Sequence, residues 1–235
     1  PIDSIYELYA NNQDSSEYMV FVIDVIDTPE CTNVVDDFES YNNLLPSDPN
    51  SNRICKTWEN GGTCTISPKL VYLGNGTGSI VDINSVFVHE GMQSMKFSYD
   101  NTGTLRPRPW SPPIACYSET TANTDNLEIG GDWTRQGVKS LSLWFCGVQG
   151  NAAEKLYVAL EDTTGNVKVV NHPDPTAVQI DTWQEWNIDL LEFITGGVNL
   201  ANIKKIHIGV GVRDNPQPGG TGIVYFDDIS LCPSP

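Results

Sequence analysis

Residues 139–147 read KSLSLWFCG, and this stretch says most about the fold. Leu141 and Leu143 alternate with serines, and because successive side chains of a β-strand point to opposite faces, the two leucines share one apolar face. Residues 155–162, KLYVALED, repeat the pattern with three apolar side chains at alternate positions. We therefore predict two strands that each place one face in a core and the other in solvent or against a ligand.

Similar short stretches follow one another along most of the chain, separated by clusters of Gly, Pro, Asn and Asp, a spacing that favours an antiparallel sandwich. After residue 30 we find no pattern of a long helix and no βαβ alternation with a glycine-rich phosphate loop, which argues against a nucleotide-binding α/β fold. We predict an all-β fold, a two-sheet antiparallel β-sandwich. The expected strands are VVDDFES (34–40), KLVYL (69–73), SVFV (85–88), SMKFSYD (94–100), KSLSLWFCG, KLYVALED, VKVV (167–170), WQEWNIDL (183–190), IKKIHIGVGV (203–212) and GIVYFDDISL (222–231).

The composition limits the partners. With 235 residues, of which 39% are hydrophobic, the chain is large enough to bury the core of one such domain. Its 30 Asp and Glu against 13 Lys and Arg give a formal net charge of -17. Nucleic acids and anionic lipids repel a surface this acidic. We expect a neutral glycan or a protein as partner, no nucleic acid and no membrane insertion.

Residues 1–30 do not follow the alternating pattern. Within them, residues 18–26 (YMVFVIDVI) are typical of a strand covered on both faces. Asp24 interrupts this apolar run, which is also too short to cross a bilayer. Pro29 in the turn-like sequence that follows cannot continue a sheet ladder. We predict an N-terminal extension, or a strand of an adjoining unit, in residues 1–30 and a sandwich module in residues 31–235.

The six cysteines are scattered, with no CxxC pair and too few histidines to complete a zinc site. This usage indicates disulfides and an oxidising compartment, so we expect the protein to be secreted or at the cell surface. Six cysteines can pair in several ways, and buried free thiols are the alternative. From their places relative to the predicted strands and loops, we expect the pairs Cys31–Cys232, Cys55–Cys64 and Cys116–Cys146.

Five motifs, taken in order along the chain, resemble a known family. They are VVDDFESY near the start, VHEGMQSMKFSYDN after it, DWTRQGVKSLSLWF midway, TWQEWNIDL later and IVYFDDISL at the end. Together they resemble a galactose-binding-like jelly-roll domain, and in particular the carbohydrate-binding modules of surface proteins from planctomycete-type bacteria. The resemblance covers roughly residues 32 to 232. It implies a jelly-roll sandwich, a glycan as ligand, and neighbouring first and last strands.

Those neighbouring strands carry five carboxylates, whose mutual repulsion a hard cation with several oxygen ligands would relieve. They are Asp36, Asp37, Glu39, Asp227 and Asp228. Alternation sends Asp37 and Glu39 to one face, and with Asp228 they are our predicted calcium ligands. The resemblance implies the same structural Ca²⁺, completed by the turn at residues 89–91, which adds Glu90 as a candidate. The alternative is that these carboxylates are solvated or accept hydrogen bonds.

Two tryptophans occupy loops where they could stack against a sugar. Sugars bind largely by packing their C–H faces on aromatic rings beside a few polar groups. Trp58 lies in a polar loop, and Trp110 lies in a proline-rich loop that stays out of a sheet. Arg106 and Arg108 near Trp110 are candidate hydrogen-bond donors to the ligand. The alternative is that both tryptophans only cover sheet edges.

No motif in the sequence indicates catalysis. The three histidines form no HExxH pattern, and no GxSxG nucleophile motif occurs. We predict a non-catalytic extracellular carbohydrate-binding module with a structural calcium. The alternative is a structural subunit of an extracellular fibre or surface layer, in which copies of the chain assemble through the N-terminal strand. A polysaccharide-active enzyme is the third hypothesis.

Overall fold

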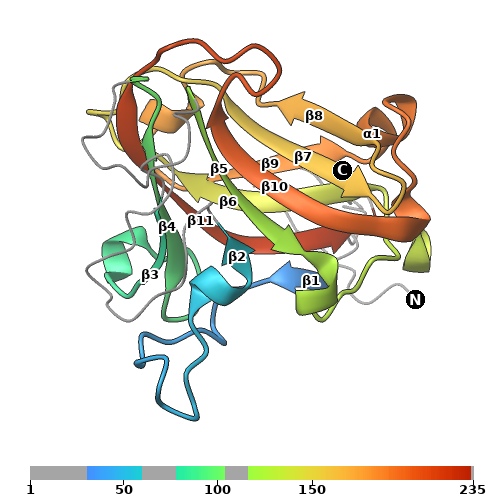
Figure 1. Ribbon diagram of the computed structural model, residues 1–235, viewed down its shortest axis with the longest axis horizontal. Helices are drawn as coiled ribbons and strands as arrows, with labels where there is room; N and C mark the ends of the chain where they lie inside the picture. The colour runs from blue at the N-terminus through green and yellow to red at the C-terminus, as the bar shows by residue number, and fades with distance from the viewer. Residues whose placement is uncertain (1–30, 60–77, 104–115, 234–235) are drawn as a thin grey trace, which may run out of the picture.

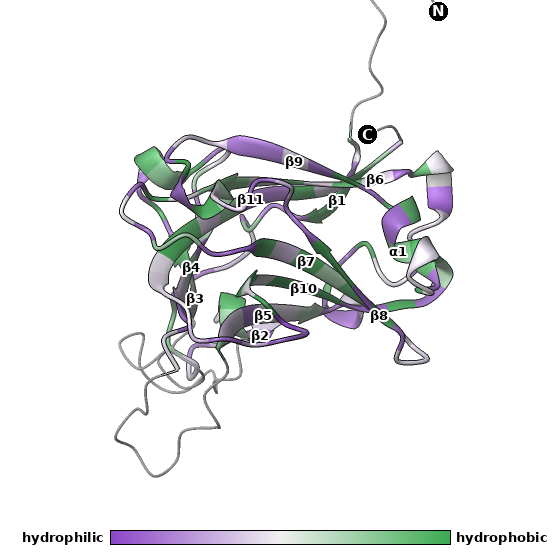
Figure 2. Ribbon diagram, turned by 90° about the horizontal axis from the view of Figure 1, so that it is seen from above, coloured by the Kyte–Doolittle hydropathy of each residue, from purple (hydrophilic) through white to green (hydrophobic). Residues whose placement is uncertain are grey.

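The computed structural model describes residues 31–59, 78–103 and 116–233. In these residues two antiparallel β-sheets pack face to face, as Figures 1 and 2 show from two directions. The prediction of an all-β, two-sheet sandwich is therefore confirmed. The first sheet has the order β3, β4, β11, β6 and β9, with β1 beside β11. Its strands are β1 (Asn33–Asp36), β3 (Gly78–Asp82), β4 (Ser94–Asp100), β6 (Ser140–Cys146), β9 (Gln184–Asp189) and β11 (Thr221–Cys232).

The second sheet has five strands in the order β2, β5, β10, β7 and β8, and it is the layer nearer the viewer in Figure 1. Its neighbouring strands are all antiparallel. Several neighbours, such as β5 and β10, are far apart in sequence, so each sheet is assembled from distant segments. The strands are β2 (Trp58–Glu59), β5 (Tyr117–Asn123), β7 (Leu156–Asp162), β8 (Val167–Asn171) and β10 (Ile203–Gly211).

The core lies between the sheets and follows the predicted alternation. In β6, Leu141, Leu143 and Phe145 are fully buried in it. Ile206 and Ile208 of β10 enter it from the opposite sheet, beside the three alternating apolar residues of β7. Because the intervening residues point away from this core, each sheet also has an outer face that can carry other functions.

The last strand changes phase in its middle. Phe226 of β11 points into the core, and after a shift in pairing register Ile229 and Leu231 do so as well. Asp228 lies at this irregularity with a φ of 45°, in the left-handed region that residues other than glycine seldom adopt. The strand can therefore carry two consecutive aspartates, Asp227 and Asp228, without placing either among the apolar side chains of the core.

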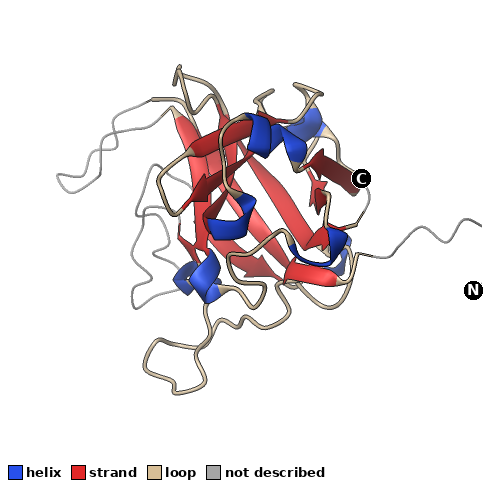
Figure 3. Ribbon diagram, turned by 90° about the vertical axis from the view of Figure 1, so that its right-hand side faces the viewer, coloured by secondary structure: helices blue, strands red, loops and turns tan. Residues whose placement is uncertain are grey.

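Some elements differ from the sequence prediction. SVFV is not a strand but a 3₁₀ turn, Ser85–Phe87, whose preceding Asn84 accepts a hydrogen bond from Val86 N. Conversely, β5 was not predicted. Figure 3 shows that the helical segments are short, and α1 (Leu191–Thr195) is the only α-helix in the described ranges. The expected strand KLVYL and residues 1–30 lie outside those ranges, so the proposed boundary at residue 30 stays a prediction.

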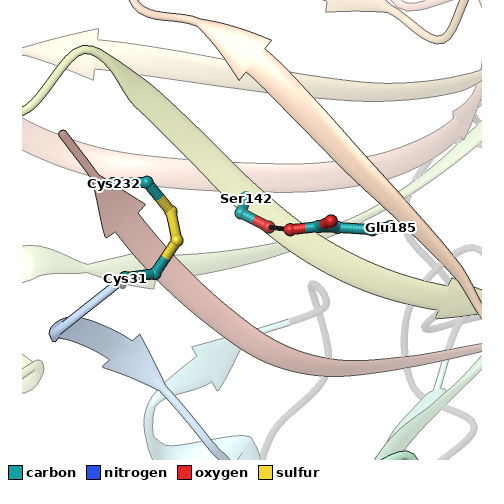
Figure 4. The surroundings of a disulfide bond; sticks show 4 residues. All are labelled: Cys31, Ser142, Glu185 and Cys232. Carbon is teal, nitrogen blue, oxygen red and sulfur yellow. Dashed lines mark hydrogen bonds between the residues drawn. A yellow bond between two sulfur atoms is a disulfide. The ribbon is translucent and has the colours of Figure 1, made fainter. Parts of the chain in front are cut away.

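A disulfide joins the two ends of the described chain, as Figure 4 shows. Cys31 is bonded to Cys232 across a sequence separation of 201, as predicted. Cys55 is also disulfide-bonded, and its predicted partner Cys64 lies outside the described residues. Figure 4 also shows the outer face of β6, where Ser142 donates a hydrogen bond to Glu185 of β9 at 2.7 Å.

The predicted Cys116–Cys146 disulfide is wrong, because both thiols are free. Cys146 ends β6 and alternates with the core residue Phe145, so it points away from the second sheet. Cys116 directly precedes β5 in that second sheet. The two cysteines therefore belong to different sheets. In the part of the chain that the structure describes, no helix has the length and apolar character needed to span a membrane.

Candidate functional site

Trp58, the first predicted ligand-stacking residue, is fully buried. Its Nε1 donates a hydrogen bond to Asp36 Oδ2 at 2.7 Å, and the Tyr41 hydroxyl donates to the same oxygen. Phe38 N donates to Asp36 Oδ1 at 2.8 Å. Burial raises the pKa of Asp36, and these hydrogen bonds oppose that rise. The prediction for Trp58 is wrong, because β2 pairs with β5 and the indole satisfies a buried carboxylate in the core.

The other predicted ligand-binding residues lie outside the described residues. They are Arg106, Arg108 and Trp110. Their roles stay predictions, and the candidate site below is built without them.

The two aspartates of β11 hold the turn that connects β3 and β4. His89 N donates to Asp227 Oδ2 at 2.9 Å, and His89 Nδ1 lies 2.7 Å from Asp228 Oδ2. The His89 ring stacks on Trp144, with ring centroids 3.8 Å apart, and packs edge-on to Trp183. Burial raises the pKa of Asp227 to about 7, against the lowering effect of the His89 N–H. These contacts fix the turn to the outer face of the six-stranded sheet.

The other predicted calcium ligands also bind protein donors. Glu39 Oε1 accepts hydrogen bonds from Met92 N at 2.8 Å and Gln93 N at 3.0 Å. Asp37 Oδ1 accepts one from Glu39 N at 3.1 Å, and Glu90 is exposed. Among the described residues, no group of three His, Cys, Asp or Glu side chains could hold a metal ion. As arranged, the side chains do not fit a preformed calcium site, and the Ca²⁺ stays a prediction.

A hollow lies on the outer face of the five-stranded sheet, and we call it the sheet hollow. Tyr117 at the start of β5 lines it, together with Arg213 and Asp214 after β10. Residues 167–169 of β8 also line it. In the sheet order, β10 and β7 lie between β5 and β8, as Figure 1 shows. The hollow therefore extends across the middle strands of the sheet.

Arg213 connects the sheet hollow to a polar network on the same face. Its Nε lies 3.1 Å from Glu119 Oε2, to which the Tyr157 hydroxyl donates a hydrogen bond at 2.8 Å. Glu119 Oε1 lies 3.1 Å from His207 Nδ1. Burial alone would raise the pKa of Glu119, but His207, Arg213 and Tyr157 together hold it below its ordinary value. The carboxylate is thus kept ionised by its neighbours.

A second carboxylate approaches the other nitrogen of the histidine. Glu161 Oε2 lies 3.6 Å from His207 Nε2. The ammonium groups of Lys204 and Lys205 lie 3.8 and 3.4 Å from the Glu161 oxygens. The His207 side chain is only 4% exposed. Two carboxylates from β5 and β7 therefore flank one nearly buried histidine from β10, and each carboxylate has cationic partners.

The sequence analysis did not predict the network of Glu119, His207 and Glu161, because no local motif indicates it. Glu119, His207 and Glu161 each occupy an outward position of a strand whose inward positions form the core. Only the pairing register brings them together, since it places His207 opposite Thr121 of β5 and Ala159 of β7. The alternation of KLYVALED was the one available signal, because it sends Glu161 to the outer face.

Comparisons with known proteins bear on the fold. No family model and no curated protein matches the sequence. Among solved structures, an exo-β-agarase aligns with a TM-score of 0.52 and 15% identity, over 87% of this chain and 25% of that chain. A family 11 carbohydrate-binding module from Clostridium thermocellum, in complex with a β-1,3-1,4-mixed-linked tetrasaccharide, aligns with a TM-score of 0.47 and 17% identity, over 85% and 94%. The solution structure of CtCBM11 aligns with a TM-score of 0.47 and 20% identity, over 88% and 97%.

The solved structures similar to this chain thus include carbohydrate-binding modules. Against the exo-β-agarase, the chain corresponds to a quarter of that protein's length. None of the three is described as a surface protein of a planctomycete-type bacterium, so that part of the resemblance is not supported. At these identities the likeness to the exo-β-agarase establishes a shared fold, the two-sheet β-sandwich, and no more.

Proposed function

We propose that the protein binds a glycan in the sheet hollow, as a non-catalytic extracellular module. The observation that carries this proposal is the network of Glu119, His207, Glu161 and Arg213, which places charged hydrogen-bonding groups on one sheet face beside the hollow. Each sugar hydroxyl both donates and accepts, so neighbouring carboxylate and guanidinium groups suit it. Hydrogen bonds to charged groups are also stronger than those between neutral groups.

Tyr117 supplies the apolar part of the proposed contact. It lines the hollow and is partly exposed, so its ring can pack against the C–H face of a sugar. Val167 and Val169 of β8 line the hollow as well. The strands β5 and β8 are three strand spacings apart, roughly 14 Å, so a sugar chain that contacts both would lie over β10 and β7.

The charges favour a neutral glycan. Glu119 is balanced by Arg213, and Glu161 by Lys204 and Lys205, so the network leaves little net charge for a ligand. The whole chain carries a formal charge of -17. A polyuronate or sulfated polymer approaching the hollow would meet an acidic protein surface that repels it.

The lowered pKa of Glu119 does not suit the role of a catalytic acid. A glycosidase needs a carboxyl group that keeps its proton near neutral pH, and such groups have raised pKa values. Glu119 has the opposite environment, because Arg213 and His207 favour its ionised form. The proposal of a non-catalytic module predicts no release of reducing ends when the protein is incubated with any glycan that it binds.

Isothermal titration calorimetry with soluble neutral polysaccharides tests the site. We expect at least one of β-1,3-1,4-glucan, xylan, agaro-oligosaccharides and galactan to bind, and Glu119→Gln to weaken that binding by about tenfold or more. The matched control is Glu185→Gln, since Glu185 lies on the outer face of the other sheet. If no polysaccharide binds, or if only the Glu185 variant loses affinity, the site assignment is overturned.

Calcium and secretion are separate parts of the proposal. The disulfide-bonded cysteines, Cys31 with Cys232 and also Cys55, support an oxidising compartment.

Calcium is tested by thermal unfolding with added Ca²⁺ and with a chelator, because an ion held by the native state alone raises the melting temperature. Identical melting temperatures in the two conditions would remove calcium from the proposal and leave the glycan site untouched.

A further inference from the structure

His207 lies between two carboxylates that approach different nitrogens of its ring. Its Nδ1 is 3.1 Å from Glu119 Oε1 and 2.9 Å from Thr121 Oγ1. Its Nε2 is 3.6 Å from Glu161 Oε2 and has no hydrogen-bond partner among the described residues. Because the His207 side chain is only 4% exposed, solvent compensates little for the missing partner. One nearly buried nitrogen of the network is therefore unsatisfied.

The contacts of Nδ1 decide where the proton of a neutral His207 ring lies. The pKa of Glu119 is below its ordinary value, so the carboxylate is ionised and can only accept a hydrogen bond. In a neutral ring Nδ1 then carries the hydrogen, and Nε2 carries a lone pair. This lone pair faces the Glu161 oxygen, and the two acceptors repel each other, in keeping with their separation of 3.6 Å. A second proton, placed on Nε2, turns this repulsion into attraction.

The Glu161 oxygen that faces His207 is shared with a lysine. The Lys205 ammonium lies 3.4 Å from Oε2, and the Lys204 ammonium lies 3.8 Å from Oε1. When His207 gains a proton, Nε2 becomes a second donor to Oε2, so the carboxylate is drawn toward the ring. Glu161 is paired in register with Val167 of β8, and Val167 lines the sheet hollow. The carboxylate therefore changes its partner next to the hollow.

His207 is surrounded by ionisable groups of other kinds. An ordinary histidine changes its charge between pH 5 and 8, whereas ordinary carboxyl groups do so at lower pH, and Lys, Tyr and Arg at higher pH. An effect of pH within this range therefore tests the histidine rather than its neighbours. These neighbours are Glu59 of β2, Glu119 of β5, Tyr157 and Glu161 of β7, Lys204 and Lys205 of β10, and Arg213.

We propose that the charge of His207 controls glycan binding in the sheet hollow. This inference rests on the proposed function and adds its regulation by pH. Charged His207 engages Glu119 and Glu161 at the same time, so fewer carboxylate lone pairs remain to accept hydrogen bonds from sugar hydroxyls. Neutral His207 engages Glu119 alone and leaves Glu161 available. Glycan affinity is therefore lower at mildly acidic pH than at pH 8.

Calorimetry at pH 8 and pH 5.5 tests this control, with whichever of β-1,3-1,4-glucan, xylan, agaro-oligosaccharides and galactan binds at pH 8. We expect the affinity of the wild type to fall by about threefold or more at pH 5.5. His207→Asn should have nearly the same affinity at both pH values, because its amide nitrogen can replace Nδ1 toward Glu119 but does not change charge. No fall in the wild type, or an equal fall in His207→Asn, overturns the proposal.

The matched control for calorimetry is His89→Gln. The His89 ring packs on Trp144 at the outer face of the other sheet, so its replacement should leave the pH dependence of glycan affinity intact. Loss of the pH dependence in His89→Gln, with its retention in His207→Asn, would assign the effect to the wrong sheet and overturn the proposal.

Nuclear magnetic resonance of the ligand-free protein separates this inference from the proposed function. The chain has three histidines, so comparison with His89→Gln and His172→Gln assigns the ring signals of His207. As the pH falls, we expect the ring to change from the Nδ1–H form to the doubly protonated form, and the carboxyl carbon signal of Glu161 to shift with it.

Each result of this measurement decides the link between His207 and Glu161. If the two signals shift together but no polysaccharide binds at any pH, the proposed function fails and the link stands. If the ring keeps one form from pH 8 to pH 5.5, or if the Glu161 signal does not follow it, the inference is overturned even when a glycan binds.

Discussion

Trp58 acts as a hydrogen-bond donor to a buried carboxylate, and this role predicts how its replacement behaves. Trp58→Phe keeps most of the apolar volume but removes the donor to Asp36 Oδ2. Because a buried charged acceptor that loses a donor is destabilised, we expect the free energy of unfolding to fall by about 1–3 kcal/mol in urea unfolding. Trp133→Phe, which removes a donor to the neutral carbonyl of Gly130, is expected to cost less. Reduced glycan affinity at unchanged stability would contradict this role.

Glu119 gives the fold a pH dependence. Burial would raise its pKa, but His207, Arg213 and Tyr157 hold the folded value below the ordinary one. A carboxyl group of this kind stabilises the fold above its unfolded pKa of about 4.3, and the contribution is lost as the pH falls through the folded pKa. We therefore expect the wild type to be more stable than Glu119→Gln at neutral pH, and this advantage to disappear as the pH falls through the folded pKa of Glu119. The free energy of unfolding of both proteins is measured in urea at several pH values. A difference between them that does not change with pH would contradict the lowered pKa of Glu119.

At the scale of single residues, the sequence predicted some side-chain contacts and not others, for physical reasons. The Cys31–Cys232 disulfide could be predicted because both residues adjoin strands that the order of motifs places side by side. The predicted Cys116–Cys146 disulfide was wrong because it depends on the face of β6 to which Cys146 points, and the prediction did not take that face into account. The predicted ligand-stacking role of Trp58 was wrong because its strand, β2, has only two residues, too few to show a periodic pattern in the sequence.

Gly209 shows how one strand position shapes the proposed binding face. It lies in β10 under the ring of Tyr157, and an added Cβ would collide with that ring. Gly209→Ala therefore forces the ring to move and pulls its hydroxyl from Glu119. We expect a loss of about 1–3 kcal/mol in unfolding free energy, together with weaker glycan binding.

The matched substitution for this test is Gly150→Ala. An added Cβ at Gly150 meets no atom within 4 Å, so we expect a change of no more than about 0.5 kcal/mol. Urea unfolding compares the two variants, and calorimetry compares their glycan affinities. Equal effects of the two alanines would show that Tyr157 is not held over Gly209.

Whole strands could be predicted from the sequence where the alternation is strict and the inward-facing side chains are apolar. This holds for β6 and β7, whose inward residues are fully buried. It fails for β5, because its inward positions include Ser118 and Thr120, which are buried but polar. Alternation also does not predict the phase change at Asp228. The bulge there depends on the pairing of β11 with β6, which the local periodicity of the sequence does not indicate.

At the scale of the whole molecule, the two outer faces of the sandwich differ in what covers them. A turn covers part of the six-stranded sheet, with Phe87 stacked on Tyr225 and His89 on Trp144. On the five-stranded sheet a hollow lies beside a network of paired charges. The sequence could foresee that each sheet has an outer face but not which one is covered, because the covering turn reaches β11 across more than half of the chain.

The Cys31–Cys232 disulfide ties the two ends of the module together. Because it closes a loop of 201 residues, it restricts the unfolded chain strongly, and its removal is expected to lower the free energy of unfolding by about 2–5 kcal/mol. The variant with Cys31→Ser and Cys232→Ser tests this in urea unfolding, with the free thiol variant Cys116→Ser as control. Glycan affinity under native conditions should be unchanged, because the sheet hollow lies on the other sheet. If both variants are as stable as the wild type, pairing of β1 with β11 alone suffices to hold the two ends together.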